Sequence, residues 1–186
     1  MSQPRETYEV RVGEAVRHLR LFEVAPGVRI AILNILGDTE LVAEAAKALA
    51  PRIPAVADVL ITPEVKSIPL AHQLAVETGL PYVVARKERK LYMGEAIGEE
   101  VVSITTGKPQ TLWLDEKDLP LMDGKNVVVV DDVVSTGGTL AGLRKLIAKA
   151  RGNVIAEVAV FTEGNDPDKW KGIIAVGNLP VFLDSE

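Results

Sequence analysis

The chain of 186 residues is long enough for one domain with a substantial hydrophobic core and too short for two domains of usual size. It contains no cysteine, which excludes a disulfide framework and a thiolate metal site, and its net charge of −5 argues against a protein that binds nucleic acid. No apolar run approaches the ~20 residues that a membrane span needs, and the polar first residues lack the apolar core of a signal peptide. We therefore expect one domain, located in the cytoplasm and without a membrane partner.

Helical and strand-like patterns alternate through the middle of the chain. Residues 38–50 repeat apolar side chains at helical spacing, and the aspartate at their first position can cap the helix. Residues 56–62 follow as an expected strand, and residues 67–79 as a second helix that Gly79 ends. A short strand over residues 81–85 leads into a basic turn.

The second half of the chain continues this alternation. Residues 99–104 and 110–114 flank a short polar turn, which predicts a hairpin arm or a mobile flap. Residues 126–132 form the most apolar strand, and residues 139–152 form the helix that follows it. Two late strands are expected over residues 154–163 and 172–183. Strands that alternate with long helices predict an α/β fold: an open, mainly parallel sheet with helices on both faces.

The stretch NVVVVDDVVSTGGTL, residues 126–140, ends an apolar strand in two adjacent acids. Asp131 and Asp132 lie at the carboxyl end of a strand, where open parallel sheets bind ligands. Because side chains alternate along a strand, we expect the two carboxylates to point to opposite faces. The loop that follows precedes a helix, and its two glycines and backbone N–H groups suit a phosphate. An aspartate-capped strand end with an ordinary glycine turn fits the spacing as well.

The residues of this stretch carry a resemblance. An apolar run, Asp-Asp, two apolar residues and Ser-Thr-Gly-Gly-Thr resemble the phosphoribosyl pyrophosphate (PRPP) signature of type I phosphoribosyltransferases. The segments APGVRIAILNILGD, ADVLITPEVKSIPLAHQLAVETGLPYVVARKERKL and VAVFTEG resemble the adenine-type purine members of that family, in the same order. The resemblance implies that Asp131 and Asp132 are catalytic acids that hold the ribose hydroxyls. It assigns the 5′-phosphate to the loop residues Val134, Ser135, Thr136, Gly137, Gly138 and Thr139.

The basic run RKERK, taken alone, indicates a solvated turn. The resemblance implies instead that Arg86 and Lys87 bind the pyrophosphate and that Lys90 adds charge nearby. Lys66 and Ser67 stand in a second pyrophosphate loop, where adenine-type enzymes show Arg-Gly. Because lysine lacks the guanidinium fork and serine adopts fewer backbone conformations than glycine, we expect weaker PRPP binding or a reshaped loop.

The expected base-binding end departs further from the adenine-type pattern. Ile30 and Ile32 stand where those enzymes carry Phe-x-Asp, so they form either an apolar wall for a flat base or a part of the core. Glu163, at the end of a late strand, either contacts the ligand or is an exposed acid. The tip of the hairpin matches a mobile flap or is an ordinary β-turn, and its residues are Thr106, Gly107 and Lys108.

The resemblance implies one phosphoribosyltransferase-like domain, with a small hood and base region over residues 1–37 and a core over residues 38–186. The implied reaction moves the phosphoribosyl group from PRPP to a nitrogenous base, with a purine, by default adenine, as acceptor in nucleotide salvage. Mg²⁺ is implied as a cofactor that PRPP carries, without direct protein ligation, although Asp131 or Asp132 is available as a contact.

A PRPP-binding regulatory or sensor protein without catalysis is the alternative function. The altered Lys66-Ser67 loop and the missing Phe-x-Asp favour it. The ~25 residues before the matched region are too few for a DNA-binding segment, which weighs against it. By analogy with the family we expect a homodimer.

Overall fold

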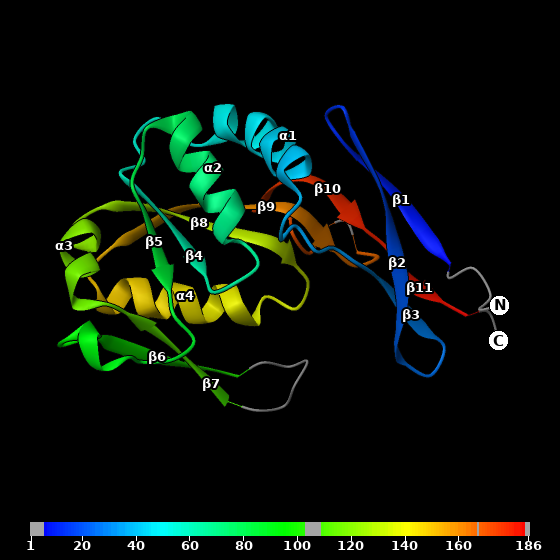
Figure 1. Ribbon diagram of the computed structural model, residues 1–186. Helices are drawn as coiled ribbons and strands as arrows, with labels where there is room; N and C mark the ends of the chain where they lie inside the picture. Colours follow the sequence, from blue (N-terminus) through cyan, green and yellow to red (C-terminus); the bar gives the residue numbers. More distant parts are fainter. Residues whose placement is uncertain (1–5, 103–108, 167, 185–186) are drawn as a thin grey trace.

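The computed structural model describes residues 6–102, 109–166 and 168–184. Its central sheet has five parallel strands in the order β10-β9-β8-β4-β5 (Figure 1). The strands are β4 (Val59–Pro63), β5 (Tyr82–Ala85), β8 (Asn126–Val134), β9 (Asn153–Glu163) and β10 (Ile174–Leu179). The open parallel sheet confirms the α/β class expected from the alternating pattern.

Helices cover both faces of the central sheet (Figure 1). α1 (Thr39–Leu49) and α2 (Ile68–Thr78) pack on one face, and α4 (Gly138–Lys149) packs on the other. Successive valines of β8 point to opposite faces of the sheet: Val128 packs with α1 and α2, and Val129 packs with α4. A strand buried on both faces explains the uninterrupted run of valines. Among the described residues, no helix has the length and apolarity to cross a membrane.

Local sequence signals set the helix boundaries. Asp38 Oδ1 accepts a hydrogen bond from the Leu41 N–H at 3.1 Å, and Gly79 ends α2 in the left-handed region with a φ of 72°. Both boundary predictions are confirmed. Strand β4 begins later than predicted, because a turn that the Ala57 N–H closes on the Pro54 carbonyl at 2.9 Å comes first. Strand β8 contains both acids, as predicted, and extends past the predicted end at residue 132 to Val134.

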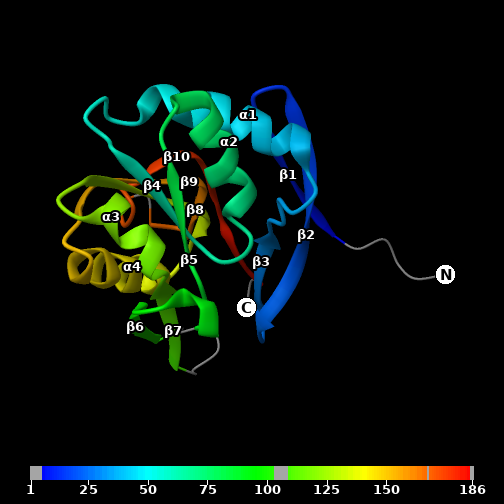
Figure 2. The ribbon, with the colours of Figure 1, turned by 60° about the vertical axis from the view of Figure 1, so that its left-hand side comes forward.

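A second, antiparallel sheet lies beside the central one and is called the hood sheet here (Figures 1 and 2). Its strands run in the order β1 (Thr7–Val12), β2 (Ala15–Ala25), β3 (Val28–Ile32) and β11 (Val181–Leu183). The sequence patterns predicted no strands before residue 38. The expected division after residue 37 left the last strand with the core, whereas β11 pairs with β3. The hood sheet is therefore built from both ends of the chain.

A two-stranded hairpin packs beneath the central sheet, next to α4 (Figure 2). It consists of β6 (Ile97–Val102) and β7 (Pro109–Leu114), antiparallel as predicted. Lys149 Nζ of α4 donates a hydrogen bond to the Gly98 carbonyl at 2.9 Å, which ties the hairpin to the helix. The predicted flap residues Thr106, Gly107 and Lys108 lie outside the described residues. The remaining short helices are α3 (Leu119–Met122) and the 3-10 turns Ala50–Arg52, Leu91–Met93 and Glu116–Asp118.

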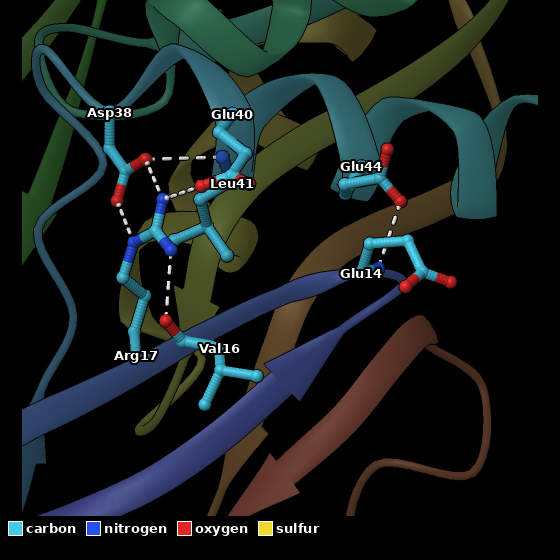
Figure 3. A network of polar contacts seen from close by, with 7 residues as sticks. All are labelled: Glu14, Val16, Arg17, Asp38, Glu40, Leu41 and Glu44. Atoms are coloured by element: carbon cyan, nitrogen blue, oxygen red, sulfur yellow. Dashed lines mark hydrogen bonds and ion pairs between the residues drawn. The ribbon is translucent and has the colours of Figure 1, made fainter.

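An ion-pair network joins the hood sheet to α1 (Figure 3). The Arg17 guanidinium of β2 donates to both carboxylate oxygens of Asp38, each at 2.6 Å, and to Glu40 Oε2 at 2.8 Å. Farther along α1, Glu44 Oε2 accepts from the Glu14 backbone N–H at 3.1 Å. The helix that opens the central domain is thereby attached to the hood at two points.

Candidate functional site

A cavity of about 490 Å³ opens between the carboxyl ends of the central strands and β3 of the hood sheet. Such an edge is where open parallel sheets bind ligands. Ten of the residues predicted for the site line this cavity: Ile30, Ile32, Lys66, Ser67, Lys87, Asp131, Asp132, Ser135, Thr139 and Glu163. Six others lie outside its lining: Arg86, Lys90, Val134, Thr136, Gly137 and Gly138. The fold thus brings most of the predicted set to one place.

The two acids converge on a single serine. Ser67 Oγ donates to Asp131 Oδ1 at 2.7 Å and lies 3.3 Å from Asp132 Oδ1. The Asp132 backbone N–H donates to Asp131 Oδ1 at 2.9 Å and to Ser67 Oγ at 3.0 Å. Strand alternation predicted that the two carboxylates point to opposite faces of the sheet. This prediction is wrong for the carboxylate oxygens, because both side chains turn toward Ser67 at the end of the strand.

Burial dominates the electrostatics of this pair. Asp131 and Asp132 are 7% and 9% exposed. Burial, followed by the charge of Asp132, raises the pKa of Asp131 to about 7, and the hydrogen bond from Ser67 opposes that rise. The site can therefore hold or release a proton near neutral pH.

The loop after β8 has the geometry of a helix N-terminus that opens toward the cavity. Gly137 caps α4 with a φ of 82°, which favours glycine, and a Cβ there would come within 2.8 Å of Trp170. Ser135 and Thr139 contribute to the cavity wall, while Val134 is buried at the end of the strand. α4 spans twelve residues, so its N-terminal N–H groups and dipole favour an anion at this wall.

The basic residues divide into two groups. Lys66 and Lys87 line the cavity. The Arg86 side chain instead pairs with Glu64, Nε to Oε1 at 3.2 Å, and Lys90 pairs with Glu88, Nζ to Oε2 at 2.5 Å. Lys66 and Lys87 form no ion pair within the described residues. Both can therefore face an anionic ligand in the cavity.

Isoleucines of β3 form the opposite wall. Along this strand Ala31 is buried in the core, whereas Ile30 and Ile32 line the cavity and Ile32 is 39% exposed. The apolar-wall interpretation fits this alternation better than the core interpretation. Glu163 lies half-buried at the end of β9, where burial raises its pKa against the opposing charge of Lys169.

Sequence reasoning missed several residues at the site. Gln110 and Leu112 of the hairpin line the cavity. Lys169 Nζ donates to the Ser135 carbonyl at 3.0 Å, and the Trp170 indole N–H donates to the Glu163 carbonyl at 3.1 Å. No local pattern marks these residues. Gln110 and Leu112 reach the site through the packing of the hairpin, and Lys169 and Trp170 reach it when the segment after β9 folds back toward the loop between β8 and α4.

A dedicated metal site is not found in the described ranges, since no three His, Asp or Glu side chains gather there into a group that could hold an ion. Asp131 and Asp132 supply two carboxylates side by side. Carboxylate oxygens of this kind suit Mg²⁺, which typically binds one or two protein carboxylates and takes its other ligands from water and substrate phosphates.

Comparisons with known proteins agree with this architecture. A sequence model of the phosphoribosyl transferase domain matches residues 31–181. The hypoxanthine/guanine phosphoribosyltransferase of Methanococcus voltae is 32% identical over 150 residues, which cover 81% of this chain and 73% of that protein. The purine biosynthesis transcriptional repressor PurR of Bacillus subtilis is 29% identical over 147 residues, 78% of this chain. The aligned part is 50% of the repressor, so the chain spans about half of that relative.

Solved structures show the same fold. The adenine phosphoribosyltransferase of Thermoanaerobacter pseudethanolicus superposes with a TM-score of 0.70 at 23% identity, covering 86% of this chain and 95% of that one. The enzyme of Giardia lamblia, complexed with 9-deazaadenine, gives a TM-score of 0.68 at 19% identity, with coverages of 86% and 93%. With a parallel sheet flanked by helices, an added hood and a family model that spans most of its length, the chain belongs to the phosphoribosyl transferase domain family and has the type I phosphoribosyltransferase fold.

Proposed function

We propose that this protein transfers the 5-phosphoribosyl group of PRPP to a purine base and releases pyrophosphate, in nucleotide salvage. One observation carries the proposal: a single cavity is lined by a buried acid pair, the N-terminal end of α4, two lysines and an apolar wall. Each of these features matches one part of the two substrates. PRPP carries a diol, a phosphate and a pyrophosphate, and a purine is flat and largely apolar on its faces.

The acid pair suits the sugar. Asp131 and Asp132 can accept hydrogen bonds from the two ribose hydroxyls, and their charge stabilises the positive charge that develops at the anomeric carbon as the pyrophosphate leaves. Ser135 and Thr139, with the N–H groups that start α4, suit the 5′-phosphate. The reaction needs alignment and exclusion of water more than covalent help.

The leaving group and the base occupy the remaining walls. Lys66 and Lys87 stabilise the pyrophosphate as it departs. Ile30 and Ile32 pack on the face of the base, and Glu163 stands near enough to the cavity to accept a hydrogen bond from it. The named relatives include adenine as well as hypoxanthine/guanine enzymes, which supports a purine without choosing among them.

Magnesium fits the donor set as an ion carried by PRPP. When bound, it neutralises the pyrophosphate charge. The chain's own part is to present Asp131, Asp132 and the two lysines to the donor from the wall of one cavity.

A second candidate function is a regulatory protein that binds PRPP without transferring it. The similarity to the Bacillus repressor PurR favours this alternative. So does Ser67, whose hydroxyl donates a hydrogen bond to Asp131 of the acid pair. Turnover separates the two candidates, because only the first releases pyrophosphate.

The deciding experiment supplies Mg²⁺ and PRPP with adenine, hypoxanthine, guanine, xanthine or a pyrimidine base, one at a time, and measures pyrophosphate. We expect release with at least one purine and none with the pyrimidines. The double substitution Asp131→Asn with Asp132→Asn is the negative control. PRPP binding by calorimetry without turnover on any base would favour the regulatory function, and absence of PRPP binding would contradict both.

A further inference from the structure

Ser67 sits at a helix N-terminus but does not cap it. It occupies the N-cap position of α2, where a serine hydroxyl normally accepts from a backbone N–H of the first turn. No such hydrogen bond forms here. The hydroxyl instead reaches across to β8, where it donates to Asp131 Oδ1 at 2.7 Å and accepts from the Asp132 N–H at 3.0 Å. Ser67 thus connects the N-terminus of α2 to the end of β8 instead of capping its own helix.

The acid pair has room for more hydrogen-bond donors than the described residues supply. Within the described residues, the carboxylate oxygens of Asp131 and Asp132 receive hydrogen bonds only from the Ser67 hydroxyl and the Asp132 N–H. A hydroxyl has one proton, so it can satisfy one carboxylate at a time. A vicinal diol brings two such protons. Ser67 therefore covers part of a demand that a sugar would meet in full.

The position of Ser67 makes it a competitor for such a ligand. Ser67 is 2% exposed and belongs to the cavity wall. A ligand hydroxyl that approaches Asp131 Oδ1 meets an oxygen already bound at 2.7 Å. A ligand hydroxyl must therefore displace the serine before it can bind this oxygen.

We propose that the Ser67 hydroxyl stands in for a sugar hydroxyl on the acid pair, and that a diol-bearing ligand binds by displacing it. This inference rests on the proposed function, since it concerns the same pocket. Ser67 is then a residue that sets affinity for the phosphoribosyl donor. It weakens binding of the sugar without touching the phosphate loop.

The test compares two probes by titration calorimetry: ribose 5-phosphate, which carries the diol, and inorganic phosphate, which does not. Ser67→Ala should bind ribose 5-phosphate about five-fold more tightly than the unaltered protein, the effect of one ordinary hydrogen bond. Its affinity for inorganic phosphate should not change. Ser67→Gly is a second variant that removes the same hydroxyl and should give the same result.

Thr62→Val is the matched control. Thr62 lies on β4, is fully buried, and its hydroxyl has no hydrogen-bond partner within the described residues. The variant removes a buried hydroxyl close to the site and should leave both affinities unchanged.

The outcomes separate the two claims. Ribose 5-phosphate binding that is equal or weaker in both Ser67 variants would overturn the displacement and leave the proposed function standing. Tighter binding of both probes would also overturn it, because the effect would not be specific to the diol. Absence of ribose 5-phosphate binding in every protein tested, the control included, would overturn the proposed function and this inference with it.

Discussion

At the scale of single residues, the carboxylates of Asp131 and Asp132 lie close together in a buried environment. Asp131 and Asp132 lie within hydrogen-bond reach of the same serine, and burial of both is nearly complete. A stable core would avoid this arrangement, since buried like charges are costly unless they are paired. Costly polar groups of this kind concentrate at functional sites, which supports a role in ligand binding.

Asp132→Asn should lower phosphoribosyl transfer by roughly 100-fold or more, because it removes a charge aimed at the reacting sugar. Folding should remain near that of the unaltered protein, since the amide has the same shape. The measurement is the rate of pyrophosphate release together with the thermal midpoint. Asp123→Asn, an exposed aspartate that pairs with Arg151, is the control and should leave the rate unchanged. Full activity in Asp132→Asn would count against its role at the ribose.

Asp131→Asn should stabilise the protein at high pH. Because the pKa of Asp131 is raised to about 7 by burial first and by Asp132 second, the folded protein binds more protons than the unfolded chain between the ordinary aspartate range and that value. Stability is therefore lost as the pH rises through this window, and it stays reduced above it. The amide abolishes this loss.

Thermal melts of the two proteins at pH 4, 6 and 8 test that prediction. The gain in midpoint from Asp131→Asn should be largest at pH 8 and shrink toward pH 4. A gain that does not depend on pH would show that the carboxyl is not the group responsible.

At the scale of elements, the network between β2 and the start of α1 attaches the hood to the core (Figure 3). Strand β3, the inner neighbour of β2, supplies Ile30 and Ile32 to the cavity. Hydrogen bonds from Arg17 lower the pKa of Asp38, so the attachment holds above the ordinary aspartate range and is lost only as the pH falls through the lowered value. We therefore expect the position of Ile30 and Ile32 to depend on this contact.

Arg17→Ala should loosen the hood sheet while the central sheet stays intact. We expect faster hydrogen exchange over β2 and β3 and a modest fall in the thermal midpoint. Arg20→Ala is the control, because Arg20 lies on the same strand, is exposed and forms no ion pair within the described ranges. If the two variants exchange alike, the network does not hold the hood.

Arg144→Ala should destabilise the central sheet. Glu157 is 7% exposed in the middle of β9, and the Arg144 guanidinium of α4 binds both of its carboxylate oxygens, at 2.6 and 2.5 Å. Truncation leaves a buried carboxylate without its partner, at a cost of about 1–3 kcal/mol. Urea unfolding measures this cost. Lys145→Ala, whose ammonium lies 3.8 Å from Glu99, is the exposed control and should change stability little. A cost no larger than the control's would show that Glu157 finds other donors.

At the scale of the whole molecule, the site lies where three layers meet. The central sheet supplies the two acids and the loop between β8 and α4, the hood supplies the apolar wall of Ile30 and Ile32, and the hairpin adds Gln110 and Leu112. Figures 1 and 2 show the hood sheet beside the central sheet and the hairpin beneath α4. We propose a homodimer, which the family resemblance implies. Sedimentation equilibrium should then give twice the mass of the chain, and a monomer at all concentrations would refute it.

The sequence by itself determined the local elements and the chemistry of the signature. Helical periodicity, the Asp38 cap and the Gly79 stop act over a few residues, so they could be recognised without the fold. The same holds for the run of valines that ends in two acids. These features predicted an α/β sheet, and the resemblance to type I phosphoribosyltransferases, rather than any periodicity, implied ten of the residues that line the cavity.

Only the tertiary structure decided how those residues meet. The pairing of β11 with β3 joins the two ends of the chain, the contact of Ser67 with Asp131 joins residues 64 positions apart, and Lys169 reaches Ser135 across 34. Such contacts depend on how sheets and helices pack around a shared core, and no short-range pattern encodes them. The conflict between two buried carboxylates, and the serine that partly relieves it, exist only once the chain has folded.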